Sequence, residues 1–418
     1  MSARVSRTIV FGLLARISAG SLTVIEGGAS TRFGSGPPAA TVQVHSERVW
    51  PLLLRGSRGL ASAYELGLWD SPDLVALVRL AARNAASIDR ARAKIEPLLG
   101  PPRALAGIWA RSTKARRRAE IAAHYDLGNE LFERMLDPTL SYSSAVFEHP
   151  RATLQEAQVS KLELICQKLD LSPGEHLLEI GTGWGALAIH AARTRGVRVT
   201  TTTISREQHA YATAQVERAG LQDRVTVLMR DYTDLTGSFD KLASIEMIEA
   251  VGWRRLGTYF DRCSRLLRRG GAMLLQAIVI DDRAYRVERA SRSFINTRIF
   301  PGGCLPSVEA ISSSLARRTD LQIVDLEDIT AHYVMTLQCW RRNFESRWPE
   351  LERLGYDERF RRLWTLYLAY CEAGFAERRI CDVQLLLAKP GWRDHGRDRD
   401  RVAGLRVAPA RALSGSSA

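Results

Sequence analysis

Residues 177–190 constrain the fold of this chain more than any other stretch. They read LLEIGTGWGALAIH, so an apolar run leads into three glycines and then into a helical pattern. This order predicts a buried strand, a tight turn and a helix N-terminus, because glycine lets the backbone turn sharply and approach a ligand closely. Glu179 stands inside the apolar run, where a carboxylate needs a polar partner. The stretch indicates an α/β protein with a ligand at the turn, and a purely structural turn is the alternative.

Strand and helix patterns alternate from residue 120 onward. We expect strands at 177–180, 197–204, 225–229, 239–245 and 272–280, with helices at 120–137, 153–170, 186–195, 207–219 and 255–268. Such alternation predicts a doubly wound, mostly parallel sheet that has helices on both faces and binds its ligand at the carboxyl ends of the strands. The rest of the chain, from the last of these strands to about residue 390, is expected to be helical, with a closing strand near 383–388.

The first 95 residues predict a small α+β domain. Strand-like pieces at 21–25 and 40–45 flank a turn at Gly27 and Gly28, and residues 51–95 show helical spacing. Arg16 interrupts the first apolar stretch early, which favours an amphipathic helix over a signal peptide. We expect a basic linker or helix at 96–120, the main domain at 121–390 and a disordered tail at 391–418.

The charge of the chain indicates an anionic partner. Its 418 residues carry a net charge of +13, and residues 97–119 hold six basic residues and no acidic one. Nucleic acid is disfavoured, because no aromatic residues interleave with the basic ones to stack bases. We therefore expect an anionic membrane surface as partner. The six cysteines form no metal-binding spacing, so no metal site and a cytoplasmic location at the inner membrane face are expected.

Polar side chains follow the second, third and fourth strands of the predicted sheet. Hydroxyl and amide groups follow the second strand, and Asp231 and Tyr232 follow the third, where they could hold an adenine amine and its ring face. Core filling is the alternative for Tyr232. The fourth strand runs into Glu246 and Glu249, each of which is a candidate base, anion-site partner or structural cap.

Six motifs occur in a fixed order along the chain. They are residues 124–129 (HYDLGN), 140–143 (LSYS), 179–185 (EIGTGWG), 203–208 (TISREQ), 249–252 (EAVG) and 299–307 (IFPGGCLPS). Together they resemble the cyclopropane fatty acid synthase family, which includes mycolic acid methyltransferases and fatty acid methyl-branching enzymes. The match runs from about residue 20 to 390. It implies a seven-stranded, Rossmann-like fold that binds S-adenosylmethionine (SAM). Residues 56–74 resemble the family's lipid-handling, sterol-carrier-like N-terminal domain, for which a packing domain without a ligand is the alternative.

The resemblance also implies which residues hold the cofactor. With the strand-end residues, the expected SAM site comprises Tyr142, Ser143, Glu179, Gly181, Gly183, Gly185, Thr203, Ile204, Gln208, Asp231 and Tyr232. Family enzymes methylate an alkene in an acyl chain, and a bicarbonate ion then accepts a proton. That ion is held by a Glu, a His, a Tyr and two main-chain positions.

Carried over residue by residue, these catalytic positions match only in part. The Glu is Glu249, the Tyr is Tyr333, and the main-chain positions are Ser144, where the family has Cys, and Ile278. Gln276 replaces the His. A glutamine can donate an N–H to bicarbonate, but it can neither carry a positive charge nor relay a proton.

The expected function is therefore SAM-dependent C-methylation of unsaturated acyl chains of phospholipids. The substitutions leave the product open between a cyclopropane and a methyl- or methylene-branched chain, the latter with a reductase partner if the product is saturated. The sequence also leaves open whether the protein forms a homodimer. The alternatives are a methyltransferase of another small molecule and a catalytically inactive lipid carrier.

Overall fold

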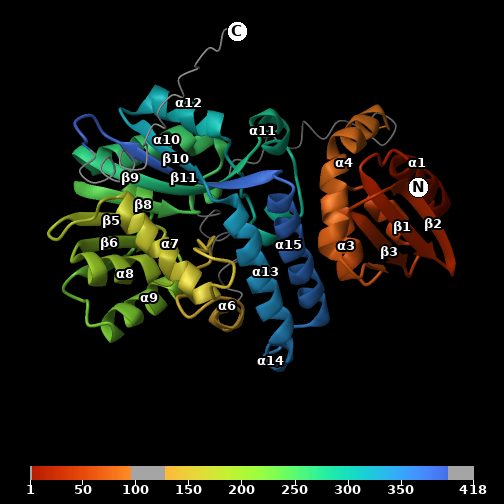
Figure 1. The fold of residues 1–418 in the computed structure, drawn as a ribbon, viewed down its shortest axis with the longest axis horizontal. Coiled ribbons are helices and arrows are strands. Elements are labelled where there is room, and N and C mark those ends of the chain that lie inside the picture. The colour runs from red at the N-terminus through yellow and green to blue at the C-terminus, as the bar shows by residue number, and fades with distance from the viewer. Residues whose placement is uncertain (1, 96–127, 394–418) are drawn as a thin grey trace, which may run out of the picture.

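The computed structural model describes residues 2–95 and 128–393 (Figure 1). The predicted basic linker, the start of the predicted helix at 120–137 and residues 394–418 of the predicted tail lie outside these ranges. Two sheets organise the described chain. One has four strands near the N-terminus, and the other has seven strands.

The seven-stranded sheet confirms the predicted doubly wound architecture. Its spatial order is β10-β11-β9-β8-β5-β6-β7, and the neighbours from β9 to β7 pair in parallel. The bounds are β5 (His176–Ile180), β6 (Arg198–Thr203), β7 (Val225–Met229), β8 (Phe239–Ile245), β9 (Leu267–Ile280), β10 (Gln322–Asp328) and β11 (Ile380–Ala388).

Two strands differ from the prediction. β10 has no counterpart among the predicted strands, and it pairs antiparallel with β11 at the edge of the sheet. β9 begins at Leu267 rather than at residue 272, so Gly270 and Gly271 lie inside the strand. The register with β8 shifts there, between Phe239 and Lys241. A positive φ of 72° at Gly270 accommodates this irregularity.

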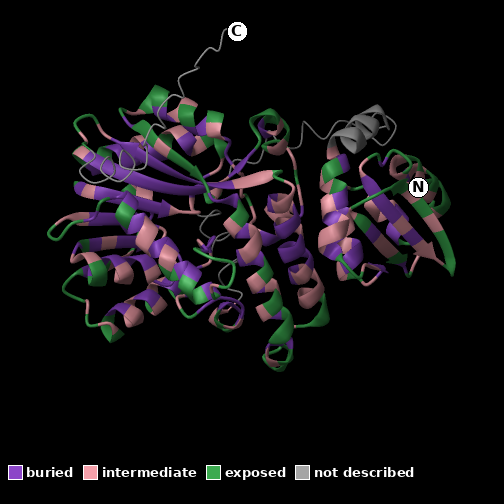
Figure 2. Cartoon of the chain, viewed as in Figure 1, coloured by how far each residue is buried: buried purple, intermediate pink, exposed green. Residues whose placement is uncertain are grey.

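Helices cover both faces of this sheet, because successive side chains of each strand point to opposite sides. Leu177 and Val199 pack in one buried cluster with α7 and α8, whereas Leu178 and Leu242 pack in another with α10 and α12. Figure 2 shows the central strands of the sheet buried and the outer helix faces exposed. The helices are α7 (Leu154–Lys168), α8 (Ala186–Arg195), α9 (Arg206–Arg218), α10 (Leu256–Leu266), α11 (Asp282–Glu288) and α12 (Val308–Arg318).

The carboxyl side of the sheet is bordered by helices that lie far apart in sequence. These are α6 (Asn129–Met135), α13 (Thr330–Ser346), α14 (Trp348–Arg353) and α15 (Glu358–Ala376). Short turns of helix follow the strands at η3 (Tyr232–Asp234), η4 (Ile248–Ala250) and η5 (Trp253–Arg255), and a π-helical turn spans η6 (Ile295–Ile299).

The N-terminal part has the predicted α+β content. Its sheet, β2-β1-β3-β4, contains β1 (Gly20–Glu26), β2 (Ala29–Ser35), β3 (Ala39–Val44) and β4 (Trp69–Asp70), with helices α1 (Ala3–Leu14), α2 (Val49–Leu53), α3 (Ser57–Glu65) and α4 (Leu74–Ile95). Gly27 and Gly28 have φ of 56° and 82°, and they form the predicted tight turn, which joins β1 to β2. β2 was not predicted, and the strand expected at 40–45, β3, pairs in parallel with β1. The predicted amphipathic helix is α1, whose Phe11 packs edge-on against Trp50 of α2 at 5.4 Å.

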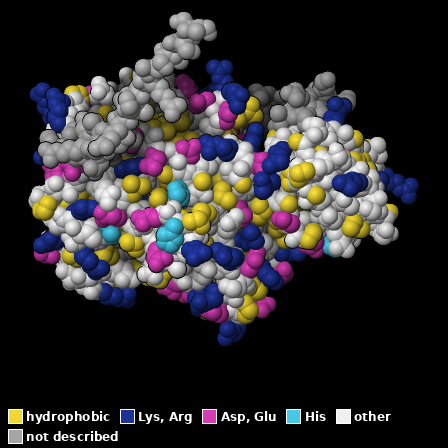
Figure 3. Space-filling view, in the orientation of Figure 1, with side chains coloured by type: hydrophobic (Ala, Val, Ile, Leu, Met, Phe, Trp, Pro, Cys, Tyr) yellow, Lys and Arg dark blue, Asp and Glu magenta, His cyan; other side chains and the backbone are white. Residues whose placement is uncertain are grey.

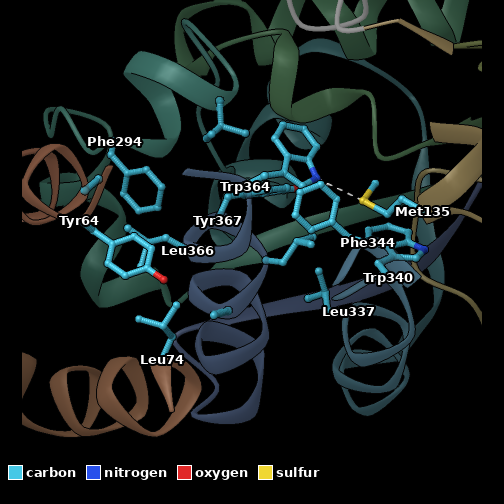
Figure 4. Close-up of a cluster of buried hydrophobic side chains, with 14 of the residues drawn as sticks. Tyr64, Leu74, Met135, Phe294, Leu337, Trp340, Phe344, Trp364, Leu366 and Tyr367 are labelled. Carbon is cyan, nitrogen blue, oxygen red and sulfur yellow. Dashed lines mark hydrogen bonds between the residues drawn. The ribbon is translucent and has the colours of Figure 1, made fainter. Parts of the chain in front are cut away.

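A continuous core joins the two parts of the molecule. Tyr64 of α3 and Leu74 of α4 lie in the same buried cluster as Leu366 and Tyr367 of α15, as Figure 4 shows. Farther along this cluster, Trp364 Nε1 contacts Met135 Sδ at 3.2 Å. The cluster also includes Tyr333 and Trp184, so packing that begins in the N-terminal part extends to the elbow after β5. Within the described ranges, no helix combines the length and apolarity required to cross a bilayer.

Candidate active site

The glycine elbow joins β5 to α8 in a left-handed turn. Gly181, Gly183 and Gly185 have φ of 100°, 53° and 98°, a region that other residues adopt only with strain. The backbone N–H groups of Gly181 and Thr182 both donate to the carbonyl oxygen of Thr202, at 3.0 and 3.1 Å. These bonds fix the turn against β6, so the strand–turn–helix expected from residues 177–190 is confirmed.

A cavity of about 210 Å³, partly open to solvent, lies beside this elbow. Ten of the eleven expected cofactor residues line it, namely Tyr142, Ser143, Glu179, Gly181, Gly183, Thr203, Ile204, Gln208, Asp231 and Tyr232. The exception is Gly185, which is the N-cap of α8. A Cβ at that glycine would stand 3.3 Å from the Cβ of Ala212 in α9, so its small size serves the packing of two helices.

The polar groups after β6 and β7 are held by local hydrogen bonds. Thr203 Oγ1 donates to Gln208 Oε1 at 2.9 Å, which fixes the amide in the cavity wall. Asp231 Oδ1 accepts from the backbone N–H of Thr233 at 3.0 Å and from its hydroxyl at 2.7 Å. One Asp231 oxygen therefore caps the following turn, and Tyr232 packs edge-on against Tyr259 at 5.5 Å.

Two charged side chains of the cavity wall are deeply buried. Glu179 is 3% exposed and Lys161 is 2% exposed. Thr201 Oγ1 donates to Glu179 Oε2 at 2.6 Å, and Lys161 Nζ donates to Ser143 Oγ at 2.7 Å. Burial raises the pKa of Glu179 to about 8 and lowers the pKa of Lys161 to about 8. Sequence reasoning missed Lys161, because a lysine within a helical pattern usually faces solvent.

Of the two glutamates that follow β8, Glu246 is the one that reaches the cavity. It directly follows β8 and lies in the cavity lining. Its Oε1 accepts from the backbone N–H of Ser144 at 2.8 Å and from Gln276 Nε2 at 2.7 Å. Its Oε2 accepts from the hydroxyl of Tyr333 at 2.6 Å. Three of the positions expected to hold bicarbonate therefore bind Glu246.

Glu249, the expected catalytic glutamate, lies outside the cavity lining. Its Oε1 accepts from the backbone N–H of Ile278 at 2.6 Å. Burial and the nearby charge of Glu246 raise its pKa to about 8. The fourth expected bicarbonate position, Ile278, is thus also bound by a carboxylate of the chain.

Asp382 of β11 adds a third buried carboxyl group that sequence reasoning missed. It is 0% exposed, and its Oδ2 accepts from Gln276 Nε2 at 3.2 Å. Gln384 Nε2 donates to Gln276 Oε1 at 3.0 Å, so the Gln276 amide is held on both sides. Burial and the charges of Glu246 and Glu249 raise the pKa of Asp382 well above its ordinary value. This shift favours the neutral form of Asp382.

Aromatic side chains surround the carboxylate cluster. The ring of Tyr333 stacks on Phe375 at 4.2 Å and meets Trp340 edge-on at 6.0 Å. The hydroxyls of Tyr142 and Tyr367 lie 2.8 Å apart. Figure 4 shows Trp340 and Tyr367 in one buried hydrophobic cluster, on α13 and α15. Such a shell excludes water, and its ring faces favour a cation. No cluster of metal-binding side chains occurs in the described residues.

Comparison with known proteins identifies the family. A family model described as mycolic acid cyclopropane synthetase matches residues 112–385. The chain is 37% identical over 344 residues to the tuberculostearic acid methyltransferase UfaA1 of Mycobacterium tuberculosis, covering 80% of each chain. It is also 37% identical over 336 residues to the cyclopropane-fatty-acyl-phospholipid synthase of Escherichia coli K12, covering 80% of this chain and 83% of the relative.

Solved structures agree with this assignment. The cyclopropane synthase MmaA2 from Mycobacterium tuberculosis has a TM-score of 0.61 at 29% identity, over 67% of this chain and 100% of that one. The mycolic acid cyclopropane synthase CmaA1, complexed with S-adenosylhomocysteine and CTAB, has a TM-score of 0.61 at 30% identity, over 65% of this chain and 98% of that one. The chain therefore belongs to the mycolic acid cyclopropane synthetase family.

Proposed function

We propose that this protein is a SAM-dependent C-methyltransferase that acts on the double bond of an unsaturated acyl chain in a phospholipid. The observation that carries the proposal is that one cavity is lined both by the expected cofactor residues and by a buried carboxylate. The glycine elbow, Thr203, Gln208 and Asp231 line it where the resemblance expects the cofactor, and Glu246 lines it beside the aromatic shell. Bound SAM supplies an electrophilic methyl group on a sulfonium, and an alkene is nucleophilic enough to take it when the two are aligned.

The residues around the cavity suit such a reaction. Methylation of an alkene leaves a positive charge on the acyl chain, which the rings of Tyr142 and Trp184 in the cavity lining would stabilise. A carboxylate beside that charge could then remove a proton. Exclusion of water protects the cation from capture, and positioning supplies much of the rate.

Incubation with methyl-labelled SAM and vesicles of a monounsaturated phospholipid tests this function. We expect label in the acyl chain, with loss of one double bond per methyl group transferred when a ring forms. Vesicles of a fully saturated phospholipid are the matched control, because they offer no π bond. Equal labelling of both vesicle types, or no labelling of either, would contradict the proposal.

A methylene-branched product is the second candidate. Gln276 replaces the expected His, and its amide is occupied by Glu246, Asp382 and Gln384. The basic side chain expected beside the reacting carbons is therefore replaced by a neutral group. Mass spectrometry and NMR of the product separate the candidates. A cyclopropane shows no vinylic carbon, whereas a methylene branch does, and a reductase partner is needed only if the cellular product is a saturated methyl branch.

We assign residues 1–95 to lipid handling and the protein to the cytoplasmic membrane face. The four-stranded sheet packs through α3 and α4 against α15, and α15 contributes Tyr367, whose hydroxyl lies 2.8 Å from that of Tyr142 in the cavity lining. A lipid held near this junction would lie close to the reacting groups. The net charge of +13 favours an anionic bilayer, and Figure 3 shows Lys and Arg side chains spread over the visible face.

The surface around η5 and α11 suits contact with such a bilayer. Trp253 is 36% exposed and Val287 is 71% exposed. The guanidinium groups of Arg254 and Arg289 lie 4.5 and 4.9 Å from the Trp253 ring centroid. Val251, two residues before Trp253, lines the cavity. Aromatic and apolar groups flanked by arginine are typical of a surface that enters lipid headgroups.

The double variant Trp253→Ala, Val287→Ser should bind anionic vesicles about tenfold more weakly, because two apolar side chains no longer enter the lipid. Sedimentation with vesicles containing phosphatidylglycerol measures this binding. Leu354→Ser is the control, since Leu354 is 50% exposed and follows α14, at the opposite end of the view from α11 (Figure 1). Unchanged binding of the double variant would place membrane contact elsewhere.

A further inference from the structure

Glu246 holds the position that an added anion would need. Its carboxylate receives the Ser144 N–H, the Gln276 amide and the Tyr333 hydroxyl at 2.6–2.8 Å. These lengths are typical of charge-assisted hydrogen bonds to an ionised carboxylate. Bicarbonate would compete for the same donors beside a fixed negative charge, so the residues present do not fit a bicarbonate ion.

The backbone conformation after β8 places Glu246 in this position. Its φ is +49°, a left-handed conformation that glycine adopts freely and glutamate does not. The backbone N–H of Glu246 donates to the carbonyl oxygen of Gln276 at 2.9 Å. The strained residue is thus tied to the β9 residue whose side chain it also binds. Strain of this kind persists where the surrounding structure enforces it, and it is common at functional sites.

Resting on the proposed function, we propose that the Glu246 carboxylate replaces bicarbonate in this enzyme and accepts the proton released after methyl transfer. A C–H bond of the cationic acyl chain breaks, and its electron pair forms a ring bond or a new double bond. The proton passes to an oxygen of Glu246, which becomes a neutral carboxylic acid. SAM is the only co-reactant, and it leaves as S-adenosylhomocysteine.

The groups that face Glu246 orient its carboxylate and set its basicity. Burial raises its pKa, against the lowering effect of Tyr333, Ser144 and Gln276 and of the positive charge of Lys161. A base with a raised pKa accepts a proton more readily. Asp382 and Glu249, the other acids of the cluster, have raised pKa values as well, and Glu246 is the one of the three that lines the cavity.

Glu246→Gln tests the base. The amide is isosteric but cannot accept the proton, so turnover should fall about 100-fold or more while SAM affinity by calorimetry stays within about threefold. Turnover within about threefold of the wild type would overturn the proposal. If the wild type transfers no label to lipid at all, the proposed function fails, whereas the bicarbonate-binding measurements below still test the site.

Glu246→Gly tests the replacement of bicarbonate. Glycine suits the positive φ, and removal of the side chain frees the three donors. We expect bicarbonate to raise the melting temperature of this variant and to restore part of its turnover. The wild type should show neither effect, and its turnover should persist in buffer stripped of carbon dioxide. Asp170→Gly is the matched control, because the exposed Asp170 also has a φ of +49° and lies away from the cavity lining.

Two results would overturn the replacement. One is a wild-type enzyme whose turnover falls on removal of bicarbonate and returns on its addition. The other is a folded Glu246→Gly variant, checked by circular dichroism, that shows no bicarbonate-dependent stabilisation. If that variant does not fold, Glu246→Ala provides the same opened site for the same two measurements.

Discussion

At the scale of single residues, the site is a set of buried charges that fix one another. A left-handed conformation at Glu246 costs about 1–3 kcal/mol, and three hydrogen bonds to its carboxylate offset that cost. The carboxylate is consequently held in one orientation before any substrate binds. Preorganised groups of this kind need little rearrangement during the reaction.

Tyr333→Phe should lower turnover about 10-fold to 100-fold, because one charge-assisted hydrogen bond to Glu246 is lost. That bond lowers the pKa of Glu246, so its loss raises the pKa and keeps the base protonated to a higher pH. The acid limb of the pH–rate profile should therefore move to higher pH. Tyr259→Phe is the control, since Tyr259 is buried in a different core cluster. An unchanged acid limb would mean that Tyr333 does not act through the pKa of Glu246.

SAM affinity should depend on the protonation of Glu179. Its pKa of about 8 leaves it mostly neutral below that pH, and the positive charge of SAM favours the ionised form. Binding should therefore release a proton, and affinity should rise with pH up to about 8, by at most about tenfold per unit. Calorimetry in buffers of different ionisation enthalpy measures the released proton. Glu179→Gln should abolish this pH dependence, and its persistence would assign the proton to another group.

At the scale of elements, the site depends on how closely α8 approaches its neighbours. Gly185 begins α8 against Ala212 of α9, and the same turn carries Gly181 and Gly183 into the cavity wall. The position of the cofactor wall is thus set by helix packing. On the other side of the cavity, one long strand, β9, presents both Gln276 and the Ile278 N–H to the two glutamates.

Gly185→Ala should lower the free energy of unfolding by about 1–2 kcal/mol from left-handed strain, with an added loss from crowding against Ala212. It should also weaken SAM binding, because α8 must shift. Gly220→Ala is the control, since Gly220 has a φ of +66° and a Cβ added there would meet nothing within 4 Å. Chemical denaturation and calorimetry measure both variants. Equal losses in the two would rule out the crowding argument.

At the scale of the whole molecule, the N-terminal part is fixed to the catalytic sheet by α15. Arg362 Nε donates to the Tyr64 carbonyl at 2.5 Å, and Nη2 donates to the Trp69 carbonyl at 2.9 Å and to Asp70 Oδ1 at 2.6 Å. Glu377 binds Arg79 and Arg83 of α4, each at 2.7 Å. These contacts orient the two parts relative to each other.

Arg362→Ala should lower the free energy of unfolding by roughly 2–4 kcal/mol, because two partly buried carbonyls and a carboxylate lose their donor. Urea denaturation followed by tryptophan fluorescence measures this loss. Arg361→Ala is the neighbouring control, since Arg361 is more exposed and its ion pair with Glu358 spans 3.4 Å, so its cost should be below about 1 kcal/mol. Similar losses for the two arginines would mean that the junction adds little stability.

Local pattern was enough to predict much of the fold. The apolar run before Gly181, the alternation that follows it and the turn at Gly27 and Gly28 each depend on neighbours in sequence. The edge strand β10 was missed, because its pattern QIVDLED is mostly exposed and lacks a buried face. Ten of eleven expected cofactor residues line one cavity, because the carboxyl ends of parallel strands meet at one edge.

The sequence by itself determined the sheet, the glycine elbow and the family, since strand–turn–helix order and motif spacing are local properties of the chain. Only the tertiary structure decided which carboxylate faces the cavity. Glu246 and Glu249 are three residues apart and look equivalent in sequence, yet Glu246 meets Ser144, Gln276 and Tyr333. Those donors come from a loop, a strand and a helix that long-range packing brings together. Burial by such packing, which sequence spacing does not record, also sets the pKa of each acid.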